Sequence, residues 1–162
     1  MRQLRPVLSG SVIVVLAVLL APSVSAADLD FTLTAPKGWT QRTQSSALAH
    51  YKKGPGSFIL TADVMPATAN TPDGYVTFAK SQLSQVLKDV VYEPVVAGNT
   101  DGHDSRELRY VSVSSGMKLK YDVLYVFKGG KAYTLTGATM VDFFTPEFAA
   151  DLKAFFDSFR FK

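Results

Sequence analysis

The sequence predicts an α+β domain in which two helices cover a mainly antiparallel sheet. Between residues 91 and 140, long apolar runs are joined by short turns, which is typical of an antiparallel meander. Two segments, one starting near residue 72 and one near residue 146, repeat apolar residues with the period of an α-helix. Alternating runs near residue 30 and between residues 47 and 65 add further strands.

The first 26 residues have the regions of a secretory signal peptide. Arg2 and Arg5 give a positive start, an unbroken apolar run covers residues 12–21, and the small residues Val-Ser-Ala end the segment at positions 24–26. The apolar run is shorter than the roughly 20 residues that a membrane-spanning helix needs. We therefore expect cleavage after Ala26 rather than a retained membrane anchor. The chain has no cysteine, which excludes the attachment of lipid to an N-terminal cysteine.

We expect the mature chain, residues 27–162, to be one domain that is periplasmic or secreted, without stable insertion into a membrane. Its length is ordinary for a domain that buries a core without disulfides. Removing Arg2 and Arg5 from the charge balance leaves 15 basic and 14 acidic side chains, a formal charge of +1. A nearly neutral domain has no bulk field to attract nucleic acid or anionic lipid, so we expect neither as a partner.

The first half of the mature chain begins with a predicted strand and a predicted hairpin. Residues 29–34 alternate apolar and polar side chains, which indicates a half-buried strand, and a turn then leads to Trp39. Residues 47–53 and 57–65 flank the Gly-Pro-Gly segment at 54–56 and therefore predict a hairpin.

A helix is predicted to begin at the end of the polar linker 66–74 and to run to about Asp89. Thr71 can cap this helix, Pro72 suits its first position and Asp73 suits its first turn. The apolar side chains fall on one face, where we expect them to be buried: Tyr75, Val76, Ala79, Leu83, Val86, Leu87 and Val90.

The second half predicts a meander of strands. Gly129 and Gly130 are a two-residue hairpin signal. The strand that precedes them carries apolar residues on both faces, so we expect it to be central and covered on both sides. The predicted segments are strands at 91–98, 105–115, 119–127 and 131–140, with a polar loop at 99–104.

The end of the chain, residues 142–162, holds seven of the eleven phenylalanines. Thr145 and Pro146 mark the start of a helix. A helix that binds a membrane surface carries Lys and Arg on its polar face, whereas this one carries three acids and a single lysine. We therefore expect its apolar stripe to be buried against the sheet, with residues 160–162 as a short final strand or a tail. The stripe consists of Phe148, Leu152, Phe155, Phe156 and Phe159.

Both ends of the mature chain resemble those of PsbP-like and DcrB-like domains. The opening, residues 31–41, joins an apolar strand to a Pro-x-Gly-Trp turn. In the C-terminal part, the strand at 132–139 is followed by an acidic and aromatic linker, a helix and the Ser-Phe-Arg-Phe segment at 158–161. The resemblance covers residues 29–161 and implies an α/β/α sandwich, with helices on both faces of the sheet. It implies binding or support of other proteins and brings no catalytic residues, and the chain departs from lipoprotein relatives because it lacks cysteine.

No catalytic, cofactor-binding or metal-binding residues are predicted. The chain has no cysteine nucleophile, no Gly-x-Ser-x-Gly elbow and no phosphate-binding loop. Asp101, His103 and Asp104, with Glu107 nearby, are conceivable metal ligands. We favour a turn in which Asp and Asn side chains bond their own backbone. His50, the other histidine, lies on a predicted strand and is interpreted as a surface or core-edge residue.

These observations predict an exported soluble protein of the cell envelope that binds another envelope protein and is not an enzyme. We expect its contact surface on the linker 66–74, the loop 99–104 and a lysine-bearing hairpin. These lysines could instead protect strand ends from aggregation. A small hydrolase with an unrecognised site and a carrier of a small apolar ligand held between sheet and helix are the alternatives. The lysines are Lys118, Lys120, Lys128 and Lys131.

Overall fold

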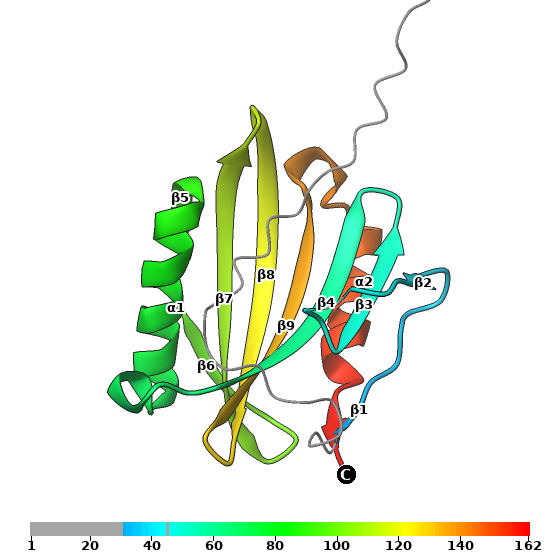
Figure 1. Ribbon diagram of the computed structural model, residues 1–162. Coiled ribbons are helices and arrows are strands. Elements are labelled where there is room, and N and C mark those ends of the chain that lie inside the picture. The colour runs from blue at the N-terminus through cyan, green and yellow to red at the C-terminus, as the bar shows by residue number, and fades with distance from the viewer. Residues whose placement is uncertain (1–30, 45) are drawn as a thin grey trace, which may run out of the picture.

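The computed structural model describes residues 31–44 and 46–162 (Figure 1). Within them, eight strands form one sheet in the order β2-β3-β4-β9-β8-β7-β5, with β6 paired to β7. Every pairing between these strands is antiparallel. The expected leader and its cleavage site before Ala27 lie outside the described residues. The strands are β2 (Thr40–Gln41), β3 (Ala49–Lys53), β4 (Gly56–Val64), β5 (Lys88–Tyr92), β6 (Val96–Thr100), β7 (His103–Ser114), β8 (Met117–Lys128) and β9 (Lys131–Met140).

The predicted hairpins form, with tighter turns than expected. β3 and β4 close across Gly54 and Pro55, because Lys53 pairs with Gly56. The predicted loop 99–104 is mostly strand, since only Asp101 and Gly102 separate β6 from β7. Both turn residues have positive φ, 53° and 79°, which gives a two-residue turn that matches the twist of its strands.

Helix α1 (Pro72–Val86) begins where the sequence predicts. The Thr71 hydroxyl accepts a hydrogen bond from the Gly74 backbone N–H at 3.1 Å, which satisfies one of the free N–H groups of the first turn. A short 3₁₀ helix, η2 (Ala67–Ala69), occupies the linker before it.

The predicted end of this helix at Asp89 is wrong. The chain becomes extended at Leu87, and the next five residues form strand β5, which pairs with β7 across a register shift between Lys88 and Val91. Pairing with the sheet overrides the helical period there, so Val90 belongs to a strand and Val86 is 54% exposed. In the first turns of the helix, the apolar side chains of Tyr75, Val76 and Ala79 are buried as predicted.

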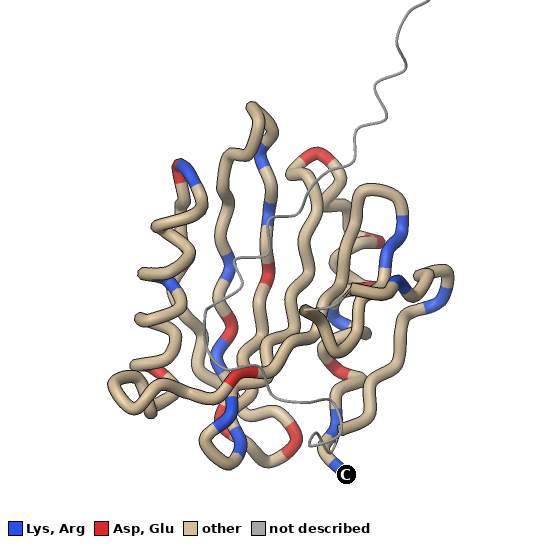
Figure 2. The backbone as a smooth tube through the Cα atoms, viewed as in Figure 1, with Lys and Arg blue, Asp and Glu red and all other residues tan. Residues whose placement is uncertain are grey.

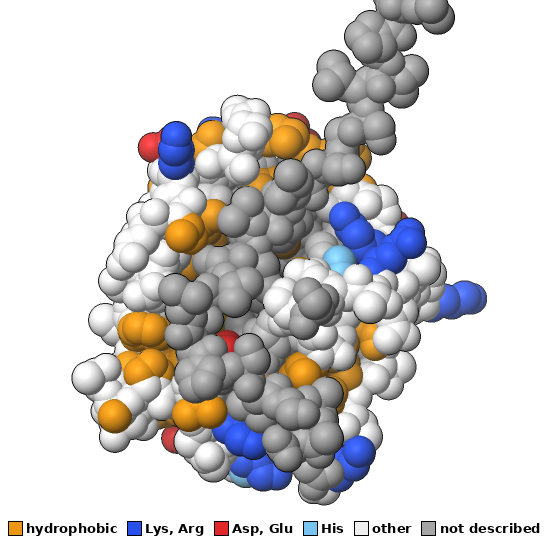
Figure 3. Space-filling model, in the orientation of Figure 1, with side chains coloured by type: hydrophobic (Ala, Val, Ile, Leu, Met, Phe, Trp, Pro, Cys, Tyr) orange, Lys and Arg blue, Asp and Glu red, His pale blue; other side chains and the backbone are white. Residues whose placement is uncertain are grey.

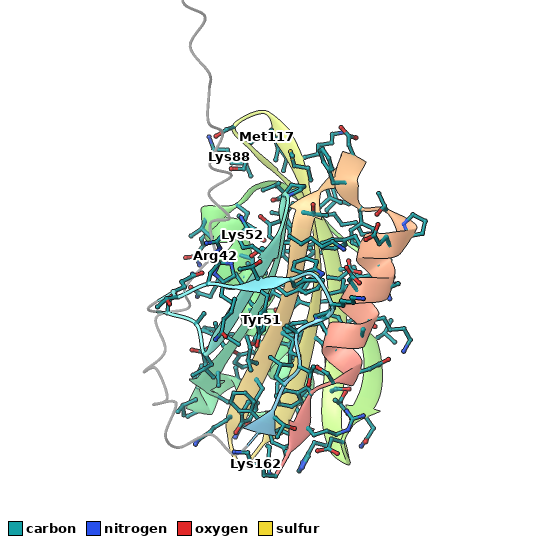
Figure 4. All side chains as sticks on the ribbon, turned by 90° about the vertical axis from the view of Figure 1, so that its right-hand side faces the viewer. Arg42, Tyr51, Lys52, Lys88, Met117 and Lys162 are labelled. Atoms are coloured by element: carbon teal, nitrogen blue, oxygen red, sulfur yellow. The ribbon has the colours of Figure 1, made fainter. Side chains whose placement is uncertain are left out.

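Helix α2 (Pro146–Asp157) packs across one face of the sheet (Figures 1 and 4). The Thr145 hydroxyl caps it by accepting a hydrogen bond from the Phe148 N–H at 3.2 Å. A short 3₁₀ helix, η3 (Val141–Phe143), connects β9 to it. The predicted stripe is core, since Phe148, Leu152, Phe155 and Phe159 are buried and Phe156 is partly buried. Neither helix of the described chain has the length and apolar character needed to span a bilayer.

Two cores lie on the two faces of the sheet, and the central strand β8 supplies both. Tyr121, Val123 and Tyr125 pack in the core beside α1, whereas Val126 packs in the core beneath α2. α2 approaches β9 closely at Gly137, where an added Cβ would lie 3.0 Å from Leu152 Cδ2 and nearer still to Cδ1. The described chain is thus an α+β domain with a mainly antiparallel sheet and two α-helices.

The two ends of the described chain pair with each other. Strand β1 (Phe31–Thr32) and strand β10 (Arg160–Phe161) form a small antiparallel sheet, in which Phe31 lies opposite Phe161. The Ser158 hydroxyl also bridges to both the N–H and the carbonyl of Thr34, at 3.1 Å each. The predicted first strand ends at Thr32 rather than at Thr34, its first two residues lie outside the described part of the chain, and the predicted final strand is confirmed.

Candidate functional site at the loop end of the sheet

One end of the sheet collects three segments that are far apart in sequence. A hollow of about 450 Å³ there is lined by residues of all three. The sequence predicts a contact surface on the same three segments. The structure brings together the linker, the loop 99–104 and the part of the lysine-bearing hairpin that contains Lys128. We call this lining the loop end: Met65, Asn70 and Pro72 beside the linker, Asn99, Gly102, His103 and Asp104 from the β6–β7 hairpin, and Phe127, Lys128, Gly129 and Gly130 from the β8–β9 hairpin.

Antiparallel pairing explains why these segments meet. β8 ends, β9 begins, β6 ends and β7 begins at the same edge of the sheet, and the chain leaves β4 there as well. Gly129 and Gly130 make the turn with φ of 58° and 74°. The Met65 N–H donates a hydrogen bond to the Gly130 carbonyl at 2.9 Å, which holds the start of the linker against the glycine turn.

An ion pair fixes the start of α1 at this end. Arg106 of β7 donates to both carboxylate oxygens of Asp73, from Nε at 2.7 Å and from Nη2 at 3.2 Å. These hydrogen bonds lower the pKa of Asp73 and raise that of Arg106. Two parallel contacts of this kind fix direction as well as distance, so the helix start and the strand are held in one geometry.

The last strand also reaches the loop end, which sequence reasoning missed. The Phe161 N–H donates to Asp101 Oδ2 at 2.7 Å. The Phe161 ring lies 4.2 Å from Lys128 Nζ and 4.7 Å, edge to face, from the His103 ring. Phe161 therefore organises two side chains of the loop end, although no local signal in its neighbourhood marks it for that role.

The four lysines of the predicted hairpin do not form one patch. Lys128 and Lys131 pair with each other across the glycine turn at the loop end. Lys118 lies at the other end of β8, opposite Val113, and Lys120 lies 4.0 Å from the ring centroid of Phe144. The loop end carries charges of both signs, as Figure 2 shows, and basic side chains also lie along the lower margin of the face in Figure 3.

Among the described residues, the β6–β7 turn contains one side chain, that of Asn99, that bonds the local backbone. Asn99 Oδ1 accepts a hydrogen bond from the Gly102 N–H at 3.0 Å, and the Asp101 carboxylate accepts one from the Phe161 N–H. Glu107, the fourth conceivable ligand, accepts hydrogen bonds from Arg109. Among the described residues there is no group of three or more His, Asp or Glu side chains placed to hold a metal ion.

The other histidine forms a pair that the sequence did not reveal. His50 Nε2 lies 2.9 Å from the Ser57 hydroxyl across the β3–β4 hairpin. Burial lowers the pKa of His50, and so do the charges of Lys52 and Arg42, which Figure 4 shows on the side of the sheet away from α2. His50 Nδ1 has no hydrogen-bond partner among the described residues, and Ser57 is only 1% exposed. Among residues 31–44 and 46–162, no acid is bonded to this histidine in the way that orients a catalytic one.

No protein-family model matches this chain, and no curated protein matches its sequence. Solved structures share its fold. The crystal structure of LpqN, involved in cell envelope biogenesis of Mycobacterium tuberculosis, has a TM-score of 0.61 at 14% identity and covers 80% of this chain and 82% of that chain. The solution structure of cyanobacterial PsbP (CyanoP) from Synechocystis sp. PCC 6803 has a TM-score of 0.55 at 14% identity, covering 88% of this chain and 99% of that chain. The chain has a PsbP-like α+β fold, and the comparisons do not support the DcrB-like part of the resemblance.

Proposed function

We propose that this protein is an exported, non-catalytic accessory domain of the cell envelope, an α/β/α sandwich of PsbP type that binds another envelope protein through its loop end. One observation carries the proposal: three segments distant in sequence line a single hollow of about 450 Å³. Loops held by a rigid sheet are the usual place for recognition.

The loop end is pre-ordered, which favours binding. Its glycine turn is bonded to Met65, Lys128 lies over the Phe161 ring, and the neighbouring Arg106 and Asp101 are held by hydrogen bonds within the domain. Side chains that are already fixed lose little rotamer freedom when a partner arrives. The charges are of both signs, so the matching partner surface is mixed and polar rather than a strongly charged polymer.

Export is supported by the signal-peptide pattern of residues 1–26 and by the kind of protein that shares the fold. LpqN is involved in cell envelope biogenesis, and an envelope location suits a domain of the same fold. Mass spectrometry of the protein recovered outside the cytoplasm tests this step. The N-terminus is expected at Ala27, and recovery of an intact leader in the membrane fraction would contradict it.

Charge reversal tests the loop end as the contact surface. We expect Lys128→Glu with Lys131→Glu to reduce capture of the partner at least tenfold in cross-linking and quantitative mass spectrometry, with the unfolding midpoint nearly unchanged. The matched control is Lys88→Glu with Lys118→Glu, because both lysines are exposed and lie opposite Val113 at the far end of the sheet. Equal capture by both double variants would overturn the proposed surface.

A small hydrolase is the second candidate, and the Ser57–His50 pair is the observation that favours it. Non-catalytic function predicts that Ser57→Ala or His50→Ala leaves the biological role intact in a folded protein. Loss of function in a variant with a wild-type unfolding midpoint would assign an acid–base or nucleophilic role to this pair. Retention of function in these variants would contradict a hydrolase that uses the Ser57–His50 pair.

A further inference from the structure

A second concave surface lies between α2 and the sheet, and of the residues that define the loop end its lining includes only Asn99. It is a groove of about 580 Å³ over β6, β7 and β8. Its wall on the helix side is apolar and includes Leu152 and Phe156, with Phe144 at one end. Its floor is charged and consists of Glu107, Arg109, Lys120 and Asp122, whose charges of both signs appear on the middle of β7 and β8 in Figure 2.

The cationic side chains of the floor already interact with other residues of the domain. Arg109 donates to Glu107 Oε1 from Nε at 3.0 Å and from Nη2 at 2.6 Å. Lys120 Nζ lies over the Phe144 ring. Lys153, on the rim, is paired with Asp157. An anionic ligand would have to break one of these contacts to find a counter-charge.

Asp122 differs from these cations, because its carboxylate is buried and its hydrogen-bonding capacity is not filled by the described residues. Its side chain is 10% exposed, and Oδ2 lies 3.6 Å from Arg109 Nε, beyond a hydrogen bond. Oδ1 has no hydrogen-bond partner among the described residues. Burial raises the pKa of Asp122. The Asp122 carboxylate therefore lines an open groove without a hydrogen bond from any described residue, and a buried carboxylate in that state is stabilised by a donor that comes from outside.

We propose that this groove binds a primary alkylammonium group, whose N–H donates to Asp122 through Oδ2, the less buried carboxylate oxygen, while its carbon chain lies against the apolar wall formed by Leu152 and Phe156. A cation is favoured over a neutral donor because Glu107, bonded through Oε1 alone, is a second carboxylate on the same floor. Hydrogen bonds between charged groups are about twice as strong as neutral ones. The inference goes beyond the proposed function, because none of these residues belongs to the loop end.

The first test compares probes of equal length. Protein purified from cells that express the full chain is labelled with nitrogen-15 and titrated by NMR with hexylammonium, 1-hexanol and hexanoate. We expect hexylammonium to shift the amides of Asp122, Leu124 and Phe156, and to bind at least tenfold more tightly than the alcohol. Hexanoate should not bind. Equal affinity for the alcohol, or shifts confined to another surface, would overturn the proposal.

One further probe distinguishes a free amine from the lysine side chain of a partner protein as the source of the ammonium group. Nα-acetyl-lysine methylamide presents the same group on a peptide backbone. Tighter binding of hexylammonium assigns the groove to a free amine, and tighter binding of the lysine derivative assigns it to a lysine side chain of a partner. Absence of binding by both rejects the site.

A matched pair of variants tests the residue. Asp122→Asn should weaken hexylammonium binding at least tenfold and should unfold at the same or a higher urea concentration, because it removes a buried, incompletely paired charge. Asp142→Asn is the control, since Asp142 is exposed and outside the groove. If Asp122→Asn fails to fold, Glu107→Gln serves in its place with the same expectation for binding. Wild-type affinity in either folded variant would refute the assignment, and unchanged affinity in the Lys128→Glu, Lys131→Glu variant separates this test from that of the loop end.

Discussion

Gly137→Ala is a single-methyl substitution that tests how closely α2 sits on the sheet. Gly137 lies on β9, and the position of an added Cβ is already occupied by the Leu152 side chain. Leu152 is buried and packs among the rings of the same core, so it has little room to move aside. The new methyl group must therefore push the helix or the leucine away.

The expected effect is a net loss of stability. Replacing glycine by alanine within a strand ordinarily gains about 0.5–1 kcal/mol. Inserting a methyl group into a filled core costs about 1–3 kcal/mol. The second effect is the larger, because the overlap falls on a branched side chain held by its neighbours. We expect Gly137→Ala to lower the free energy of unfolding by about 1–2 kcal/mol.

Urea unfolding of the single and double variants measures this value. Leu152→Ala alone should cost about 2–5 kcal/mol through the cavity that it leaves. The double variant should cost less than the sum of the two, by about 1 kcal/mol, because the alanine methyl fills part of that cavity. Coupling of this sign identifies Leu152 as the residue displaced.

Gly98→Ala is the matched control. Gly98 is also in a strand, and its added Cβ would meet only the Ser105 hydroxyl at 3.2 Å, a small group that can rotate. We expect its unfolding midpoint to stay at or slightly above that of the wild type. An unchanged midpoint for Gly137→Ala, or additive behaviour of the double variant, would show that α2 does not rest on Gly137.

Two further substitutions test the core and a buried acid. Phe155→Ala should cost about 3–5 kcal/mol, measured by urea unfolding, because Phe155 is fully buried beneath α2; an unchanged midpoint would return the phenylalanine stripe to the candidates for a partner surface. Burial raises the pKa of Asp63 from 3.8 to about 6, so the folded state binds this proton more tightly than the unfolded chain and stability falls as the pH rises between about 4 and 6. The full penalty at pH 7 is at most about 3 kcal/mol, and less after screening by solvent. Asp63→Asn should therefore be more stable than the wild type at pH 7 and lose that advantage near pH 4, and equal midpoints for the two proteins at both pH values would contradict the shift.

Local signals explain what could be predicted from the sequence. Thr71 and Thr145 each stand one residue before a proline, and both cap a helix. The glycine pair at 129 and 130 makes the predicted hairpin, and the two-sided pattern of residues 119–127 makes β8 central. Each of these features depends on residues that are neighbours in the chain, so the information is complete within a short window.

The features that escaped prediction depend on register between distant strands. Leu87 and Val90 continue a helical pattern, but pairing of β5 with β7 takes them out of the helix. The groove exists because Arg109 lies directly opposite Asp122 and because α2 covers that side of the floor. Nothing in the neighbourhood of either residue indicates its partner, so the alkylammonium site was not predictable from the sequence.

The pairing of β1 with β10 has a consequence for the order in which the chain can fold during synthesis. Phe159, among the last residues made, is fully buried and packs against Phe31, among the first of the described residues. The core beneath α2 therefore cannot be completed until the segment that follows α2 has been synthesised. A core of this kind closes late in synthesis, because its contacts join segments at opposite ends of the described chain.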